Sequence, residues 1–447
     1  MIVKFIIAAY FLVILLIGLI SYFGIKSPAD YFVAGKKAGF SAVAGSLLAT
    51  ILGGSAILGT IELSRKTGWP AIWFLFTAAL GLIILVPLSK YVKRFGNFTL
   101  PEMLGTFYGK KAEVTSSVII PVAWIGVVAA QIIAAAKILQ GLGFSYNAGA
   151  ITAGAVFIIY TLVGGQLSIL KTDRVQAFLI IVGLITLVIF SFNSPQMGQI
   201  PPLTGKALFN ESFTIGDLII LILTYSVTFI VGPDIYSRIF CAKDEKTAKR
   251  SIIVVALILI PVSFALTWLG IFSVKSGSSG IISFAVHLLP GWAYGLFIAA
   301  LLSAVMSSAD TTLLTSSIIL SELISGNLNR KNALKLTRIF IIITGTFSIL
   351  ITMYITSIVQ ALLYALTIFS GAFFIPVIGG VLRLRIIKNR VIVAIILGGI
   401  IALTGKTVHD FYNELAGNII IIVTYFISGI LLFVPRLKNR NENFYVK

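Results

Sequence analysis

The sequence predicts an all-α, polytopic membrane protein with about 13 transmembrane helices. Hydrophobic residues make up 58% of the chain and charged residues only 11%, which is too little polar surface for a soluble protein of 447 residues. Apolar runs long enough to span a bilayer recur along almost the whole chain. Lysine and arginine gather in alternate loops between these runs, which indicates repeated membrane crossings.

The gaps between the apolar runs are too short to hold a soluble domain, so we expect a single membrane transport domain over residues 1–447. The first run is too long for a typical signal peptide and is followed by no small-residue cleavage site, so we expect a retained helix. The expected helices are 2–23, 41–62, 70–89, 115–141, 147–165, 175–193, 216–238, 251–273, 291–324, 335–353, 357–382, 391–405 and 418–435.

The placement of basic residues predicts the orientation. Of the 34 Lys and Arg residues, 27 fall in the carboxyl-terminal tail and in the loops after helices 1, 3, 5, 7, 9 and 11; Arg238, at the end of the seventh helix, is among them. The positive-inside rule then predicts a multi-pass protein of the cell (plasma) membrane with its amino terminus outside and its carboxyl terminus in the cytoplasm. The net charge of +19 therefore indicates topology, with anionic lipid headgroups of the bilayer rather than nucleic acid as the partner.

Few residues are available for metal or catalytic chemistry. Cys241 is the only cysteine, and His287 and His409 are the only histidines, which argues against a disulfide, a Cys/His metal site and a His-dependent catalytic centre. No Gly-rich phosphate loop of the Walker type occurs, so ATP is not the expected energy source.

Two expected helices contain glycine breaks. Residues 45–60, GSLLATILGGSAILGT, carry Gly53-Gly54 near the middle, and residues 223–238, LTYSVTFIVGPDIYSR, carry Gly232-Pro233. Five helices separate the starts of these two spans, so the halves beginning with them would have opposite orientations. An inverted repeat of five helices with discontinuous first helices is typical of one large class of secondary transporters.

This interpretation divides the chain into four parts. The first repeat covers 41–193 and the inverted second repeat 214–383. An extra amino-terminal helix with a cytoplasmic loop occupies 1–40, and two carboxyl-terminal helices with a cytoplasmic tail occupy 384–447.

The break in the second helix predicts a cation site. A helix that stops at Gly53-Gly54 leaves the carbonyls of residues 49–52 without their i+4 amide partners. Each such carbonyl would cost several kcal/mol in contact with lipid. Because these carbonyls form the negative end of a half-helix dipole, a small cation is their natural ligand. The alternative is that the glycine pair only allows another helix to approach closely.

The ninth expected helix is unusually rich in oxygen. Residues 301–317, LLSAVMSSADTTLLTSS, contain eight hydroxyls and one carboxylate, Asp310. Ala304, Ser307, Ser308 and Thr311 fall on one helical stripe. An intramembrane carboxylate is costly and usually functional, and a dense set of hydroxyls suits a hard alkali cation. The alternative is that each hydroxyl bonds its own backbone or a neighbouring helix, for about 0.6 kcal/mol.

These segments together resemble the sodium:solute symporter family. Residues 300–312, ALLSAVMSSADTT, look like its characteristic helix, and residues 160–176, YTLVGGQLSILKTDRVQ, resemble its second signature. Weaker similarities at 29–40, 99–109 and 232–250 keep the family's order. The resemblance implies an inverted five-helix repeat preceded by one extra helix, and sodium-coupled uptake of a small organic solute by alternating access.

The resemblance also implies the ion sites. The main sodium site would use the carbonyls of Ala49, Leu52 and Ala304 and the hydroxyls of Ser307 and Ser308. Some members bind a second cation, for which the matching residues are Asp173, Ser307, Asp310 and Thr311. An acid at position 310 departs from the two-ion pattern, so we expect one coupled sodium. Asp173 has an alternative role as a helix-start carboxylate, favoured by the helix dipole beside Arg174.

The substrate is expected near the midplane, between the two breaks. The expected neighbours are Ile51, Gly53, Ser55, Ala56, Thr228, Phe229, Gly232 and Asp234. By family analogy, sugar-type and proline-type members carry polar side chains near positions 51 and 56, which are apolar here. A small amino acid or monocarboxylate is therefore favoured over a sugar, with its carboxylate at the amides that begin a half-helix.

Three other functions remain open at this point. A proton-coupled transporter of the same fold would titrate Asp310 or Asp173. A channel would need a continuous polar pore, which only the two broken helices and the ninth helix suggest. A membrane enzyme would need a nucleophile and base or a metal-ligand set, and none is visible. We expect a transporter that acts as a monomer.

Overall fold

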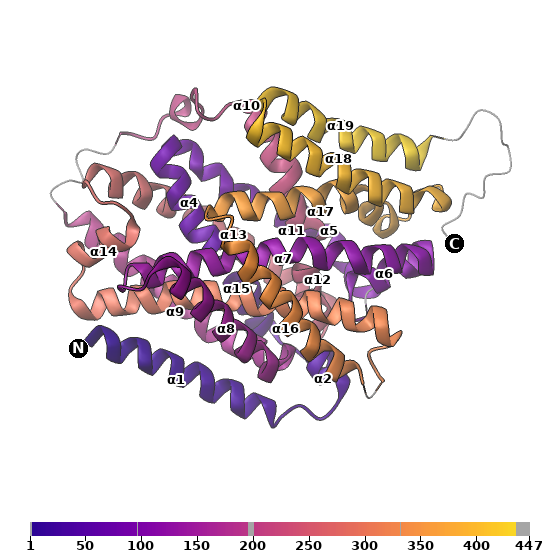
Figure 1. The fold of residues 1–447 in the computed structure, drawn as a ribbon, viewed down its shortest axis with the longest axis horizontal. Coiled ribbons are helices and arrows are strands. Elements are labelled where there is room, and N and C mark those ends of the chain that lie inside the picture. Colours follow the sequence, from indigo (N-terminus) through magenta and orange to yellow (C-terminus); the bar gives the residue numbers. More distant parts are fainter. Residues whose placement is uncertain (1, 96, 195–200, 331, 435–447) are drawn as a thin grey trace.

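The computed structural model describes residues 2–95, 97–194, 201–330 and 332–434. Within these ranges 12 helices are long and apolar enough to cross a membrane, and one bent helix pair raises the number to 13. The thirteen spans expected from the sequence all correspond to these helices (Figure 1). The uninterrupted ones are α1 (Ile2–Tyr22), α5 (Ile72–Phe95), α7 (Lys110–Gln140), α8 (Tyr146–Gly164), α9 (Gln166–Phe192), α13 (Glu245–Lys275), α15 (Gly291–Ser325), α16 (Ala333–Thr352), α17 (Ile358–Val381), α18 (Val391–Phe411) and α19 (Glu414–Phe433).

Two spans are interrupted. The bent pair consists of α3 (Phe40–Ile51) and α4 (Gly54–Thr67), which meet at 42°. The second interrupted span contains α10 (Ile215–Leu221), the π-helix η5 (Ile222–Ser226), α11 (Val227–Val231) and α12 (Pro233–Cys241). Gly232, between α11 and α12, has an extended backbone. Both predicted breaks are therefore confirmed, although the first bends the chain more sharply.

Short helices connect the spans at both ends of the bundle. No strand occurs in the described ranges, where isolated bridges are the only β pairing. Local capping explains several helix starts; for example, the hydroxyls of Thr99 and Thr214 accept hydrogen bonds from the amides that begin α6 and α10. The connecting elements are α2 (Pro28–Val33), η1 (Ala34–Lys36), η2 (Trp69–Ala71), α6 (Leu100–Tyr108), η4 (Gly205–Leu208), α14 (Ile281–Leu288) and η6 (Lys388–Arg390).

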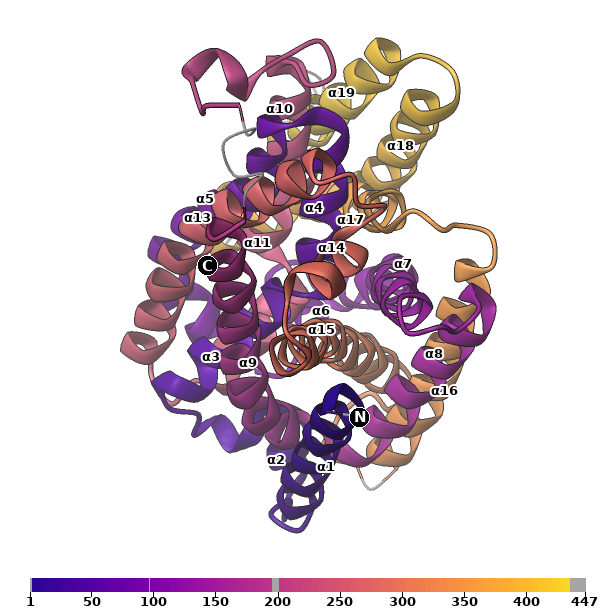
Figure 2. The same ribbon diagram turned by 90° about the vertical axis from the view of Figure 1, so that its left-hand side faces the viewer.

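The oxygen-rich helix α15 lies at the centre of the bundle. It packs against α3, α7, α9 and α16, and Figure 2 shows it surrounded by helices on all sides. In its most apolar 18-residue stretch 89% of the residues are buried, against 17% in α1, which lies at the edge of the bundle. The hydroxyls of α15 therefore face protein, whereas the uniformly apolar α1 is suited to lipid.

The glycine pair at the first break allows close packing as well. A Cβ added to Gly53 would lie 2.0 Å from Ser308 Oγ, and one added to Gly54 would lie 2.0 Å from Val305 Cγ1. The structure therefore shows both an interrupted helix and a close approach to α15 at Gly53-Gly54, and the cation site stays a prediction.

Candidate functional site

The first helix break opens onto the hydroxyl-rich face of α15. The last helical hydrogen bond of α3 runs from the Leu52 amide to the Leu48 carbonyl, at 2.8 Å. Beyond it, the Ser308 hydroxyl donates to the Thr50 carbonyl at 2.6 Å. The Ser55 amide, in the first turn of α4, donates to Gln131 Oε1 of α7 at 3.2 Å. Side chains of other helices thus meet the backbone groups that the break leaves free.

The five predicted ligands of the main sodium site are all buried where α3 and α15 meet. Ser308 bonds to the end of α3, and Ser307 donates to Asp173 Oδ1 at 2.6 Å. A hydroxyl that donates its proton keeps its lone pairs, which can still face a cation. The carbonyls of Ala49, Leu52 and Ala304 stay predicted ligands.

A buried ion pair lies next to these serines. Arg238 of α12 places Nη2 3.6 Å from Asp173 Oδ2, and the two side chains are 0% and 1% exposed. Ser46 of α3 donates to Asp173 Oδ2 at 2.5 Å and accepts from Arg238 Nε at 3.0 Å. Arg238 Nη2 also donates to the Thr311 hydroxyl. The ion pair therefore joins α3, α9, α12 and α15.

Two expectations from the sequence are wrong here. Arg238 was counted among the cytoplasmic loop charges, but it lies inside the bundle because α12 continues to Cys241. Asp173 is not a helix-start carboxylate, because α9 begins at Gln166 rather than near 175 and carries Asp173 two turns into the bundle. The helix begins earlier because Gly165, with a left-handed φ of 75°, ends α8 and lets α9 start at once.

The residues proposed for a second cation are divided between two hydrogen-bond groups. Asp173 forms an ion pair with Arg238, and the Thr311 hydroxyl accepts a hydrogen bond from the same guanidinium. Asp310 accepts instead from the Thr161 hydroxyl of α8, at 3.1 Å, and takes part in no ion pair within the described part of the chain. A fixed positive charge thus already lies beside Asp173.

A cavity of about 70 Å³ lies between the two helix breaks. Six of the eight residues predicted to contact the substrate line it: Ile51, Ser55, Thr228, Phe229, Gly232 and Asp234. Gly53 and Ala56 do not line it. Gly53 faces Ser308 and Gln131, and Ala56 is buried in the packing of α4.

Other lining residues were not predicted. They come from α7, η5, α15 and α17, and include Trp124, Gln131, Tyr225, Thr312 and Leu366. Gln131 was detectable in principle, because it is a lone amide within an apolar span. Its amide nitrogen donates to the Ser55 hydroxyl at 2.6 Å, which holds α4 against α7.

Only one of the two carboxylate oxygens of Asp234 accepts hydrogen bonds from described residues. Its Oδ2 accepts from the Trp124 indole nitrogen at 2.8 Å and from the Thr312 hydroxyl at 3.3 Å. Its Oδ1 has no hydrogen-bond partner among the described residues, although the side chain is buried. Arg238, one turn further along α12, bonds to Asp173 instead. Asp234 therefore brings a buried negative charge to the wall of the cavity, and a cationic group there would stabilise it.

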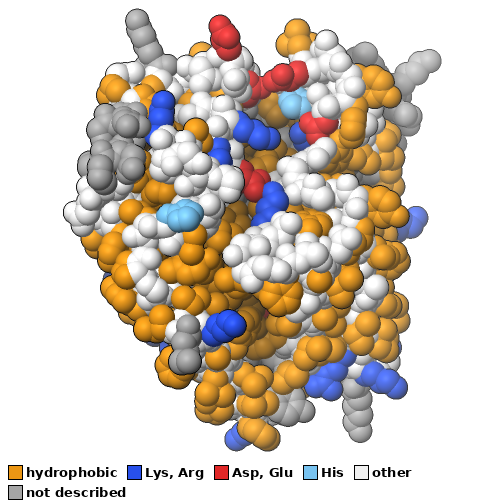
Figure 3. Space-filling model, turned by 60° about the vertical axis from the view of Figure 1, so that its left-hand side comes forward, with side chains coloured by type: hydrophobic (Ala, Val, Ile, Leu, Met, Phe, Trp, Pro, Cys, Tyr) orange, Lys and Arg blue, Asp and Glu red, His pale blue; other side chains and the backbone are white. Residues whose placement is uncertain are grey.

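A second cavity, of about 370 Å³, lies further along α4, beside the start of α14. Its lining includes Glu62, Arg65 and Lys137, and Lys137 Nζ lies 2.5 Å from Glu62 Oε1. Figure 3 shows the end of the bundle where α1 begins, with acidic and basic side chains gathered around a hollow. The 370 Å³ cavity thus lies on the same helix, α4, whose first turn lines the smaller cavity.

Comparison with known proteins agrees with this geometry. The family model described as sodium:solute symporter family matches residues 31–401. The sodium/proline symporter of Haemophilus influenzae is 26% identical over 89% of this chain and 87% of its own length. The sodium/pantothenate symporter of Escherichia coli is 24% identical over 64% of each chain. The solved structure of a Na+-coupled sialic acid symporter in a substrate-bound outward-open state superposes with a TM-score of 0.75. It is 18% identical and covers 97% of this chain and 98% of its own.

Proposed function

The chain belongs to the sodium:solute symporter family, and we propose that it takes up a compact amino acid together with one sodium ion. Family membership makes it a multi-pass transporter, not an enzyme, that couples sodium to the movement of a small organic solute. The observation that carries the choice of substrate is the buried carboxylate of Asp234 in the wall of the cavity between the breaks. A protonated amine of the substrate would supply the opposite charge.

The two half-helix starts favour one orientation of an amino acid. α12 begins with Pro233, which has no N–H, and its first turn carries the negative Asp234. α4 begins at Gly54 and has no acid in its first turn. The substrate carboxylate would therefore bind toward α4 and its ammonium toward α12. The small cavity and the apolar Ile51 favour a compact, weakly polar side chain over a sugar.

We place the sodium ion between the end of α3 and α15. The ligands would be the carbonyls of Ala49, Leu52 and Ala304 and the hydroxyls of Ser307 and Ser308. The support is the interruption of the helix after Ile51 and the Ser308 hydrogen bond to the Thr50 carbonyl, which puts α15 hydroxyls at the stranded carbonyls. The negative end of the α3 dipole adds to the attraction.

One sodium per cycle fits the buried charges. At the second possible cation position, Asp173, Asp310 and Thr311, the Arg238 guanidinium already supplies a positive charge to Asp173 and a donor to Thr311. A mobile cation there would meet an immobile one at close range, so we propose that this position stays without sodium.

Coupling follows from the shared residues of the two sites. Thr50 and Ser308 line the substrate cavity and also lie at the first break. Sodium that draws α3 and α15 together would therefore order one wall of the cavity, and each ligand would bind better in the presence of the other. With the amino terminus outside and the carboxyl terminus in the cytoplasm, a potential of 100 mV adds roughly 2.3 kcal/mol per charge carried inward. We propose that the monomer is the working unit in the plasma membrane.

A proton-coupled cycle is the second candidate. Asp310 favours it, because this carboxylate is buried in the central helix with one hydroxyl donor and no cation beside it in the described ranges. Asp173 is less suited to carry a proton because Arg238 stabilises its charged form.

Uptake into proteoliposomes separates these possibilities. The panel consists of matched pairs that differ only in the amine, such as alanine with propionate and proline with cyclopentanecarboxylate. We expect an inward sodium gradient to drive uptake of the amino acid in a pair and not of its amine-free analogue. Uptake of the analogue alone would overturn the role of Asp234, and uptake driven by a pH gradient without sodium would establish the second candidate.

A further inference from the structure

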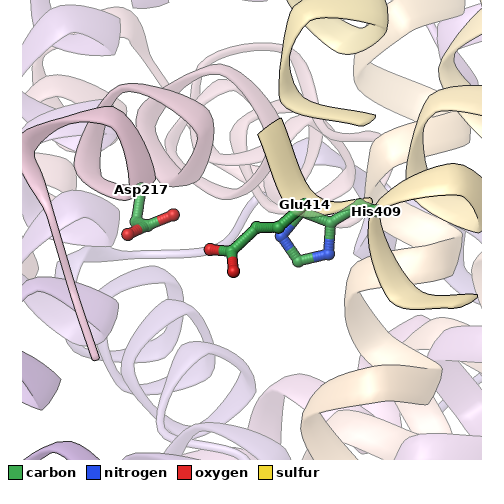
Figure 4. A group of neighbouring side chains, drawn as sticks. All are labelled: Asp217, His409 and Glu414. Atoms are coloured by element: carbon green, nitrogen blue, oxygen red, sulfur yellow. The ribbon is translucent and has the colours of Figure 1, made fainter. Parts of the chain in front are cut away.

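Three metal-ligating side chains meet away from the transport site, where α10, α18 and α19 converge. They are Asp217 in the first turn of α10, His409 near the end of α18 and Glu414 at the start of α19. One ligand atom from each lies within 4.8 Å of the other two. Figure 4 shows the Asp217 and Glu414 carboxylates pointing toward each other, with a ring nitrogen of His409 turned to the same space. All three line a cavity of about 220 Å³.

The His409 ring is held by a carboxylate outside this trio. His409 Nδ1 lies 2.7 Å from Asp410 Oδ1, so a proton on Nδ1 leaves the lone pair on Nε2. Histidines that bind metals usually make such a hydrogen bond from their other nitrogen, because it fixes the ring and raises its basicity. Lys406 holds Asp410 in turn, with Nζ at 2.6 Å.

The two carboxylates of the trio differ in mobility. Asp217 Oδ2 accepts hydrogen bonds from the amide and hydroxyl of Thr214, at 2.7 and 2.8 Å, which fixes the carboxylate and leaves Oδ1 available. Glu414 is exposed and can move its carboxylate toward the other two groups. The site thus combines two fixed ligands with one adjustable ligand.

The charge balance favours a divalent cation. Asp217 and Glu414 bring two carboxylates to this cavity, and Lys406, the one ammonium among the residues that line it, already pairs with Asp410. Zinc accepts imidazole nitrogen together with carboxylate oxygen, and three protein ligands leave its fourth position open, whereas calcium and magnesium prefer oxygen alone. We propose that Asp217, His409 and Glu414 bind Zn²⁺.

Zinc at this position would restrain the transporter. α10 belongs to the same interrupted span as α12, which carries Asp234 into the substrate cavity, whereas α18 and α19 lie outside the two predicted repeats. α19 already contacts this span, because the Tyr425 hydroxyl donates to the Leu223 carbonyl at 2.6 Å. A metal ion that joins Asp217 to His409 and Glu414 adds a second link, so any movement of α10 during the cycle becomes slower.

The chain contains its own control for a binding experiment. His287, the only other histidine, lies on α14 and is exposed. Titration of the purified full-length protein with Zn²⁺ by calorimetry, and with Co²⁺ by visible absorption, needs no substrate. We expect one equivalent to bind to the wild type and to His287→Ala. We expect His409→Ala and Asp217→Asn to bind at least about tenfold more weakly. The amide oxygen introduced by Asp217→Asn can still accept the hydrogen bonds that cap α10.

Sodium-driven uptake gives the second measurement. In metal-free buffer His409→Ala should transport like the wild type, which shows that it folds. Added Zn²⁺ should slow the wild type and His287→Ala and leave His409→Ala unaffected. Equal Zn²⁺ affinity in His409→Ala, or binding that is lost in His287→Ala, would overturn the site. Binding without any effect on uptake would overturn the restraint.

Discussion

The two interrupted helices line the same cavity but differ in their charges: the first break has only backbone dipoles, whereas the second has ionised side chains. At the first break no charged residue lies between Phe40 and Ile61, and the polarity comes from the end of the α3 backbone. At the second break α12 carries Asp234 and Arg238 on successive turns, both buried. The first break is negative without any ionised group, whereas the second contains permanent charges of both signs.

This difference assigns separate roles to the two breaks. Carbonyls of a half-helix can bind an ion and later release it to water, because no full charge is left unpaired in its absence. Separating a buried ion pair such as Arg238 with Asp173 costs more than releasing an ion from carbonyls, because each partner would keep its full charge in a poorly solvated place. We therefore propose that the first break couples the ion and that the second break supplies permanent charges for the fold and for the substrate.

Arg238→Met is expected to have the largest effect. It leaves Asp173 buried without a counter-charge, and removal of one partner of a buried pair typically costs about 3–5 kcal/mol. Thermal unfolding followed by size-exclusion fluorescence should show a strongly destabilised protein. The double variant Asp173→Asn with Arg238→Met should regain most of the lost thermal stability. If the double variant is no more stable than Arg238→Met, the two side chains do not act as a pair.

Gly53→Ala tests the close approach at the first break. The added Cβ would lie 2.0 Å from Ser308 Oγ, so α3 and α15 must separate at the proposed sodium site. Sodium-driven uptake should fall by more than about tenfold, since small displacements of positioned groups are costly. Gly39→Ala is the matched control, because a Cβ at the opposite end of α3 meets nothing within 4 Å. Normal uptake by Gly53→Ala would show that the contact is not needed.

Asp234→Asn examines the charge at the second break. The amide keeps an oxygen that can accept from Trp124 and Thr312 but cannot balance an ammonium group. Loss of one partner of a buried charge pair costs about 2–5 kcal/mol, so the apparent affinity for an amino acid should fall by about 30-fold or more. Trp124→Phe, which removes one donor to the same carboxylate, should cost less. Equal amino acid affinity in wild type and Asp234→Asn would place the ammonium elsewhere.

The sequence predicted the spans and both breaks because these depend on local properties. Apolar length defines a span, and Gly53-Gly54 and Gly232-Pro233 interrupt a helix wherever they occur. The family motifs then directed attention to Ser308, which the structure brings to the first break, and to Ser307, whose hydroxyl donates to Asp173.

The sequence was less informative about which side chains point inward. Arg238 follows an apolar run and precedes a basic loop, so its sequence context is that of a cytoplasmic anchor; only the continuation of α12 to Cys241 buries it. Trp124 and Leu366 lie on helices that are apolar on every side, where no polar face marks the cavity. The pairing of Asp173 with Arg238 depends on how α9 and α12 pack, which is a tertiary property.

Ser308→Ala is expected to have the smallest effect of the four and bears most directly on ion coupling. It removes one hydroxyl from the proposed sodium site and the hydrogen bond to the Thr50 carbonyl, but the carbonyl ligands remain. We expect the sodium concentration for half-maximal uptake to rise by about five- to tenfold, because one hydrogen bond or ligand is worth roughly 1 kcal/mol. Protein abundance should be nearly unchanged. Ser303→Ala is the control on the same helix, because its hydroxyl donates within α15, to the Ala299 carbonyl at 2.8 Å, and not to the first break. If both variants keep the sodium dependence of the wild type, the first break does not bind the coupled ion. The contrast between a releasable sodium ion at the first break and the permanent charge of Arg238 at the second would then be wrong.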